Sequence, residues 1–187
     1  MSKYLGIAAA SLACVLLATS AIASAAPTRS VNASLTGTAT WTGAFGSVTE
    51  FAIQGTFVDT SGSGSRLHSG SYSGTLTTGT YGPPDGCPFL TAFNSAPVSG
   101  TIDLVMSNGT ITTEVAPGGG TLCSNQLGAH GQSEDFELTL QVTGGTRAYA
   151  KTSGTLHLTY ESLVVISFSG EVEGPNDTGT LTGTLVG

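Results

Sequence analysis

Three residues close together in the sequence, His130, Glu134 and Asp135, form the first candidate for a chemical site. An imidazole beside two carboxylates is suited to exchanging protons with a substrate or to ligating a metal ion. Structural zinc requires four ligands, however, and no second histidine lies nearby. A solvated acidic loop explains the same residues. We therefore expect no bound metal and no cofactor.

Other residues of catalytic types stand alone or in pairs. Glu171 and Glu173 share one face of a predicted strand, where paired carboxylates could act on a glycosidic bond or simply be solvated charges. His157 has outward parity on another predicted strand, and His68 lies at the end of a loop. The sequence contains no Gly-x-Ser-x-Gly, P-loop or His-Glu-x-x-His motif. We therefore assign no catalytic residue.

Residues 143–160 join two strongly alternating segments through a pair of adjacent glycines. A glycine-rich loop binds phosphate when it leads from a strand into a helix, and neither that context nor the required spacing is present. The stretch is instead typical of a tight connection between two core strands. We expect Tyr149 to pack inward, and Arg147 and Lys151 to be exposed.

Alternation of apolar and polar residues recurs along the chain, and no amphipathic helix pattern follows residue 25. Short units that place a glycine and an aliphatic residue on one face, such as Gly154 with Leu156, fit a sheet that bends into a barrel. The predicted fold is an antiparallel, eight-stranded β-barrel, and a β-sandwich is the alternative. Strands are expected at 34–42, 48–58, 69–78, 98–106, 136–143, 154–160, 163–173 and 179–186.

Two long segments, 81–97 and 117–135, interrupt the alternation and are rich in proline or glycine. Loops of this length are usually functional, tethered or disordered, so both segments are predicted to be irregular. Between them, Asn108-Gly109 is expected to form a type I′ hairpin turn with a return strand after it.

Residues 1–25 are typical of a secretory signal peptide. A positive charge precedes the uncharged apolar run 5–17, and Ala23-Ser24-Ala25 is a small-residue cleavage site. A spanning helix needs ~20 apolar residues, which is more than this run supplies. We expect secretion or delivery to the cell envelope, with 26–187 as one soluble domain. A retained membrane anchor and a lipoprotein modified at Cys14 are the alternatives.

Charged residues make up 9% of the chain, with 5 Lys and Arg against 12 Asp and Glu and a net charge of -7. Recognition of nucleic-acid phosphates requires clustered basic residues, and so does attraction to anionic lipid. The composition therefore argues against nucleic acid and anionic membrane surfaces as partners.

Two cysteines, Cys87 and Cys123, lie outside the predicted signal peptide, one in each of the two irregular segments. An even pair in an exported chain predicts a disulfide that ties those segments together. Two free buried thiols are the alternative.

The stretch from Gly144 to Gly154 resembles a pattern of exported bacterial β-barrels related to the allene oxide cyclase and dirigent barrels. That pattern runs approximately Gly-Gly-Thr-Gly-Arg-Phe-Ala-Gly-Ala-Thr-Gly, and residues 179–185 match its closing Gly/Thr/Leu strand. The resemblance implies an eight-stranded antiparallel barrel and transfers no catalytic residue. Arg147, Ala148 and Lys151 depart from the pattern. The matching residues are Gly144, Gly145, Thr146, Ala150 and Gly154, with Tyr149 in place of the aromatic residue and Ser153 in place of the hydroxyl residue.

Two functions are compatible with these features. The first is a non-enzymatic protein that binds a small apolar ligand in the barrel mouth or contacts a surface. The alternative is a barrel enzyme of the cyclase or isomerase type, which would need an ionisable side chain inside the barrel. This alternative fails if none of Glu50, Asp103, Glu114 and Glu137 points into the interior.

Leu163 and Val165 are apolar residues with outward parity on a predicted strand. An exposed apolar pair on a protein with few charges predicts a subunit contact, and so a homo-oligomer. Coverage by the N-terminal arm of the same chain is the alternative.

Overall fold

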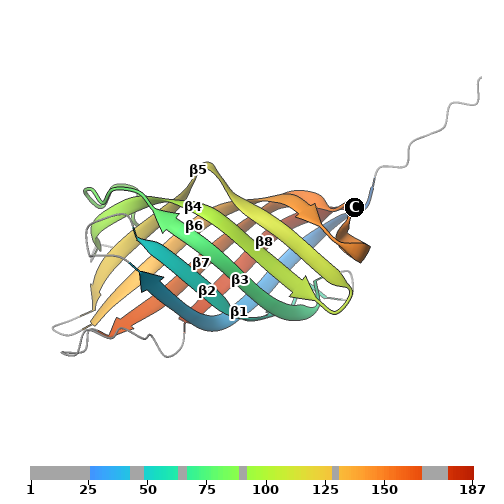
Figure 1. Ribbon diagram of the computed structural model, residues 1–187, viewed down its shortest axis with the longest axis horizontal. Helices are drawn as coiled ribbons and strands as arrows, with labels where there is room; N and C mark the ends of the chain where they lie inside the picture. Colours follow the sequence, from blue (N-terminus) through green and yellow to red (C-terminus); the bar gives the residue numbers. More distant parts are fainter. Residues whose placement is uncertain (1–25, 43–48, 63–66, 89–91, 128–130, 166–176) are drawn as a thin grey trace, which may run out of the picture.

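The chain folds into a closed barrel of eight antiparallel strands that follow one another in sequence order, with β8 pairing back onto β1 (Figure 1). The computed structural model describes residues 26–42, 49–62, 67–88, 92–127, 131–165 and 177–187. The elements are β1 (Thr28–Thr42), β2 (Glu50–Asp59), β3 (Ser69–Thr78), β4 (Ala92–Met106), β5 (Gly109–Leu127), β6 (Gly131–Gly145), the 3-10 helix η1 (Arg147–Tyr149), β7 (Ser153–Val165) and β8 (Asp177–Val186). The predicted eight-stranded barrel is confirmed, and the sandwich alternative is wrong.

Inward-facing residues of all eight strands fill the interior. Along β2, Phe51, Ile53 and Phe57 are each 1% exposed and alternate with more exposed neighbours. Phe51 packs edge-to-face against Phe136 on β6, with 5.1 Å between ring centroids. Burial of apolar surface contributes ~25 cal/mol per Å², so this packing is the main source of stability.

The two ends of the barrel differ in the residues that line their interiors. We call one end the apolar end: it holds the start of β1, the end of β8 and the β4–β5 hairpin, and the C-terminus marks it in Figure 1. We call the opposite end, where β1, β3, β5 and β7 finish, the polar end. Buried apolar residues at the apolar end include Val31, Met106, Ile111, Tyr149 and Leu185.

The prediction of an irregular segment at 117–135 is wrong, because β5 and β6 occupy most of it. Gly118 and Gly119 belong to a bulge at 116–119, where the pairing of β5 with β6 skips from Val115 to Gly120. A bulge adds residues to one strand and breaks the two-residue period. Because the alternation is lost at the bulge, the strand residues on both sides of it did not show the pattern expected of a strand.

Smaller features also differ from the prediction, beginning with β1, which starts at Thr28 instead of residue 34. β4 begins at Ala92 instead of residue 98, and β7 runs without a break to Val165, where two strands were expected. The rest of the predicted strand 163–173 lies outside the described residues. The expected hairpin is present, but Met106 pairs directly with Gly109, and Asn108 does not have the positive φ of a type I′ turn.

Two glycines of the recurring Gly-Thr units sit where neighbouring strands approach each other closely. Gly100 and Gly154 have φ angles of 141° and 150°, which side chains rarely permit. A Cβ atom would lie 2.2 Å from the carbonyl oxygen of Thr75 at the first position, and 2.2 Å from that of Thr184 at the second. These glycines therefore allow the sheet to bend into the barrel.

The connection from β6 to β7 is a short turn built on η1, as the glycine-rich stretch predicts. Tyr149 is 1% exposed, whereas Arg147 and Lys151 are exposed, which confirms all three expectations. The Thr146 amide donates to the Thr110 carbonyl at 2.9 Å, and the Thr110 amide donates to the Thr146 hydroxyl at 3.0 Å. Arg147 has a φ of 51°, a left-handed conformation at a position where the resembled pattern has glycine.

In the described part of the chain, no helix is long and apolar enough to cross a membrane. The predicted signal peptide, residues 1–25, lies outside the described residues. So do His130, Glu171 and Glu173.

Candidate functional site

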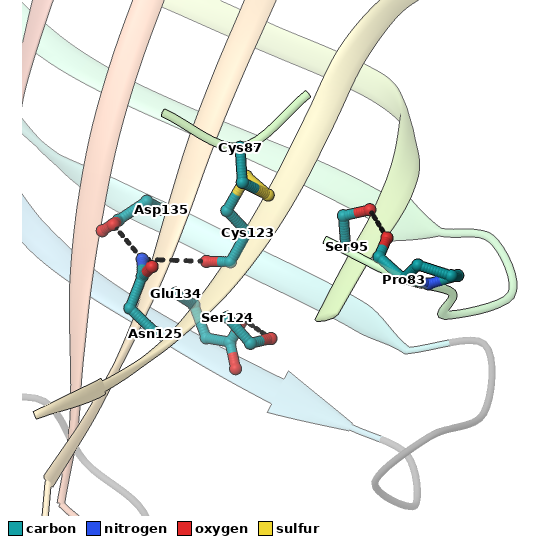
Figure 2. Close-up of a disulfide and its surroundings, with 8 residues drawn as sticks. All are labelled: Pro83, Cys87, Ser95, Cys123, Ser124, Asn125, Glu134 and Asp135. Atoms are coloured by element: carbon teal, nitrogen blue, oxygen red, sulfur yellow. Dashed lines mark hydrogen bonds between the residues drawn. A yellow bond between two sulfur atoms is a disulfide. The ribbon is translucent and has the colours of Figure 1, made fainter. Parts of the chain in front are cut away.

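A disulfide joins Cys87, in the connection between β3 and β4, to Cys123 on β5 (Figure 2). The two Cα atoms are 5.8 Å apart across a sequence separation of 36. Ser95 on β4 holds the same connection, because its hydroxyl donates to the Pro83 carbonyl at 2.7 Å and its backbone pairs with Gly82. The predicted disulfide is confirmed, and it fixes this connection to the outer wall of the barrel.

Next to the disulfide, β5 and β6 present polar side chains to both faces of the barrel wall. Ser124 and Glu134 are paired across the two strands and face the interior. Cys123 and Asp135, the next pair, face outward, as does Asn125. The neighbouring carboxyl groups of Glu134 and Asp135 therefore lie in different environments, the first in the barrel interior and the second on its outer face.

Inside the wall, Glu134 is 2% exposed. One of its oxygens accepts a hydrogen bond from the Ser124 hydroxyl at 2.8 Å, and the other accepts one from the Gln132 amide at 2.5 Å. Burial raises the pKa of Glu134 to about 7, although these two hydrogen bonds act to lower it. A carboxyl group with this pKa exchanges its proton readily at neutral pH.

A second buried carboxyl group, Asp177, lies at the same end of the interior and is 0% exposed. The Tyr72 hydroxyl donates to the Tyr160 hydroxyl at 3.1 Å, and Tyr160 donates to Asp177 at 3.2 Å. Burial raises the pKa of Asp177, opposed in part by hydrogen bonding from Ser162 and Tyr160. Burial also raises the pKa of Tyr160, so its hydroxyl keeps the proton that it donates.

These interior groups form one polar layer across the polar end of the barrel. We call it the inner cluster; its members are Ser124, Gln132, Glu134, Tyr160, Ser162 and Asp177.

Outside the wall, an open groove of about 590 Å³ crosses β6, β7, β8 and β1. We call it the outer groove. Threonine is the most frequent residue in its lining, and the hydroxyls of Thr159 and Thr180 are hydrogen-bonded to each other at 2.6 Å. Such side chains offer both a methyl group and a hydroxyl that donates or accepts. The hydroxyl residues of the groove are Ser34, Thr36, Ser133, Thr159, Thr178 and Thr180.

One side of the outer groove is acidic. Asp135 on β6 lies directly across from Glu161 on β7, and Glu137 is the next outward residue on β6. Burial, together with the charges of Glu161 and Glu137, raises the pKa of Asp135 to about 6, against the effect of a Ser133 hydrogen bond. The Asn125 side-chain amide donates to Asp135. Although Asn125 faces outward, it is only 2% exposed.

The structure separates the sequence-based candidates instead of gathering them. Glu134 and Asp135 lie on strand β6 and not in a loop, and they face opposite sides of the wall, so they do not form one acid–base group. His157 is exposed on the outer surface, as expected. Leu163 is 37% exposed, in line with its outward parity, and the side chain of Val165 lies outside the described residues.

The four carboxylates that the sequence analysis named for the interior do not point inward. Glu50, Asp103, Glu114 and Glu137 share the outward parity of their strands, and Glu50, Glu114 and Glu137 are exposed. The carboxyl groups that do face inward are Glu134 and Asp177. Both obey the alternation of their strands, since Glu134 has the parity of Phe136 and Asp177 has the parity of Leu181.

Within the described residues, no group of three or more histidine, cysteine, aspartate or glutamate side chains is placed to hold a metal ion. Comparison with protein-family models, with curated proteins and with solved structures finds no match to this chain. The resemblance to the allene oxide cyclase and dirigent barrels therefore stays a prediction.

Proposed function

We propose that this protein is a non-enzymatic binding protein that takes up a small molecule in the outer groove. The groove volume of about 590 Å³ falls in the range of small-molecule sites, ~300–1,000 Å³. The observation that carries the proposal is the burial of Asn125 and Ser133, each 2% exposed, on the face of the sheet that is normally solvated. Polar side chains enclosed at the edge of an open groove are typical of a binding site.

The outer groove is a better candidate than the barrel mouth, where the sequence placed a small apolar ligand. The described interior is filled by large side chains, with Tyr72, Phe51 and Phe136 among the largest that are fully buried. A ligand in the mouth would also meet the carboxyl groups of Glu134 and Asp177, which do not match an apolar surface.

A groove-filling substitution tests the proposal. Thr180→Trp places an indole in the outer groove, and Thr182→Trp places the same indole two residues along β8, outside the groove lining. Ligand-observed NMR against a library of small polar molecules should find binders for the wild type and for Thr182→Trp, and these should be lost in Thr180→Trp. Absence of any wild-type binder, or binders that the Thr180→Trp substitution does not affect, would overturn it.

None of the four carboxylates first named for a cyclase- or isomerase-type enzyme points into the interior, so that form of the hypothesis fails. The inner cluster supplies other buried carboxyl groups, and on that ground we propose such an enzyme as the second candidate. Glu134 has a pKa of about 7 and lies inside the barrel, as an acid–base catalyst requires. Deuterium uptake from D2O into small carbonyl compounds would reveal such proton transfer by mass spectrometry. The enzyme hypothesis predicts uptake with the wild type and none with Glu134→Gln; equal uptake with both would exclude Glu134 as the catalyst.

A further inference from the structure

We propose that the ligand of the outer groove is a small hydroxylated primary amine, with its ammonium group held among Asn125, Asp135 and Glu161. The inference rests on the proposed function of the groove and adds the chemical class of the ligand. Three observations support it: an uncompensated pair of carboxylates, a buried acceptor that no described group satisfies, and a wall of threonine hydroxyls.

The first observation is the cross-strand pair of Asp135 and Glu161. Like charges directly opposite each other on neighbouring strands destabilise a sheet. Glu137, also on the groove, adds a third negative charge. Among the residues that the structure describes, none of these three carboxylates forms an ion pair. A bound cation would remove the repulsion, so this corner of the groove is complementary to positive charge.

The second observation is the side-chain amide of Asn125. Its nitrogen donates to Asp135 and, at 3.5 Å, to the Cys123 carbonyl, and because both partners are acceptors the orientation of the amide is set. The Asn125 Oδ1 atom is then buried without a donor from the described residues, and one oxygen of Asp135 is in the same situation. A buried acceptor without a donor opposes folding. The Asn125 Oδ1 atom and this Asp135 oxygen could each accept a hydrogen bond from an N–H group of a ligand.

An ammonium group satisfies these requirements better than a metal ion does. It carries three N–H donors and one positive charge, which matches two carboxylates and an amide oxygen. Calcium takes six to eight oxygen ligands, whereas no group of three or more His, Cys, Asp or Glu side chains among the described residues is placed to hold a metal ion.

The third observation concerns the rest of the ligand. Beginning at Thr178, which pairs with Glu161 across β7 and β8, the groove presents the hydroxyls of Thr36, Thr178 and Thr180 across β1 and β8. These groups can donate to and accept from the hydroxyls of a ligand, while their methyl groups contact its carbon skeleton. A compound of the amino-sugar type combines such a hydroxylated body with a single ammonium group.

The affinity for an amine should depend on pH. Asp135 has a pKa of about 6, and the other charged groups that face it are Glu137 on β6 and Glu161 on β7; its β5 neighbour Asn125 is neutral. Protonation of Asp135 removes half of the charge of the cross-strand pair. Binding should therefore be tighter at pH 7 than at pH 5.

Calorimetric titration of the full protein with three probes tests the ligand class. Glucosamine carries the ammonium group, glucose lacks the nitrogen, and N-acetylglucosamine has the nitrogen without its charge. At pH 7 glucosamine should bind at least tenfold more tightly than either neutral sugar. Asp135→Asn and Glu161→Gln should each reduce its affinity about tenfold. Glu114→Gln, an exposed carboxylate on β5 outside the groove, should leave the affinity unchanged.

The outcomes separate the ligand class from the function of the groove. Equal affinity for glucose and glucosamine, or stronger binding of calcium than of glucosamine, would overturn the amine and leave a groove that binds small molecules. If glucosamine does not bind while other library members bind the groove, the amine proposal is likewise overturned and the groove proposal stands. Failure of glucosamine together with every library member would overturn both proposals. Circular dichroism of each variant establishes that a loss of binding is not a loss of fold.

Discussion

The two ends of this barrel fill their interiors with different kinds of side chain. At the apolar end, Ile111 and Leu185 close the interior with aliphatic side chains, as folding alone requires. At the polar end, the corresponding layer contains the carboxyl groups of Glu134 and Asp177, whose burial opposes folding. The apolar end therefore accounts for the fold, whereas the polar end keeps buried carboxyl groups that stability does not explain.

Removal of the disulfide should have the largest effect and should distinguish the two ends. In the chain-entropy model, a bond that spans 36 residues contributes roughly 4 kcal/mol to the free energy of unfolding. We expect the double variant Cys87→Ser/Cys123→Ser to lose about this much in urea denaturation. Hydrogen exchange should accelerate first in the β5 and β6 amides around Ser124 and Glu134. Uniform acceleration that includes Ile111 would contradict a local role for the bond.

Truncation at the apolar end should cost nearly as much. Ile111 is 0% exposed, and Ile→Ala substitutions in cores cost about 2–5 kcal/mol through lost burial and the cavity left behind. We expect Ile111→Ala to lower the free energy of unfolding by roughly 3 kcal/mol at every pH from 5 to 8. Val105→Ala, a substitution of an exposed residue on β4, is the matched control and should change it by less than about 0.5 kcal/mol.

At the polar end a neutral substitution should stabilise the protein. Glu134 has a folded-state pKa of about 7, above the ordinary glutamate pKa of 4.5, so the folded state binds the proton more tightly than the unfolded state. Its contribution to stability is fully present below pH 4.5 and declines as the pH rises to 7. Glu134→Gln should therefore raise the free energy of unfolding by up to about 3 kcal/mol at pH 8 and change it little at pH 4.

Urea titrations of the Glu134→Gln variant and the wild type at both pH values measure this difference. The raised pKa of Asp135 acts in the same direction, so part of the pH dependence should persist in the variant. A variant that is less stable than the wild type at pH 8 would show that the buried carboxylate is favourable, and would remove the distinction drawn between the two ends.

The smallest expected effect concerns the turn at the apolar end. Arg147 occupies a left-handed backbone conformation with a φ of 51°, which costs a residue with a side chain roughly 1 kcal/mol. Glycine relieves this strain but loses more entropy on folding. Arg147→Gly should therefore raise the free energy of unfolding by less than about 1 kcal/mol. A loss of more than this amount would mean that the arginine side chain stabilises the turn.

The sequence predicted the fold well and the site only in part, for physical reasons. Strands such as β2 bury one face, so alternation marked them, and the glycine-rich turn matched a connection between strands. The bulge at 116–119 broke the alternation of β5 and made Glu134 resemble a loop residue. Asp177 directly follows a Gly-Pro-Asn run, a composition typical of a turn, so nothing in the sequence marks it as an interior strand residue.

The outer groove could not be predicted from alternation. Thr159 and Thr180 pair across the consecutive strands β7 and β8, but Thr36 comes from the first strand, and only the barrel closure of β8 on β1 places it beside them. The burial of Asn125 on an outward face has no signal in sequence, because parity alone predicts exposure.

An NMR titration of the isotope-labelled protein with glucosamine at pH 7 tests the central claim most directly. The polar end should respond, with amide shifts concentrated at Asn125, Asp135 and Glu161 and along the start of β8. The amides of the apolar end, around Ile111 and Tyr149, should not move. Absence of shifts at the outer groove, or shifts of equal size at both ends of the barrel, would contradict the assignment of ligand binding to the polar end.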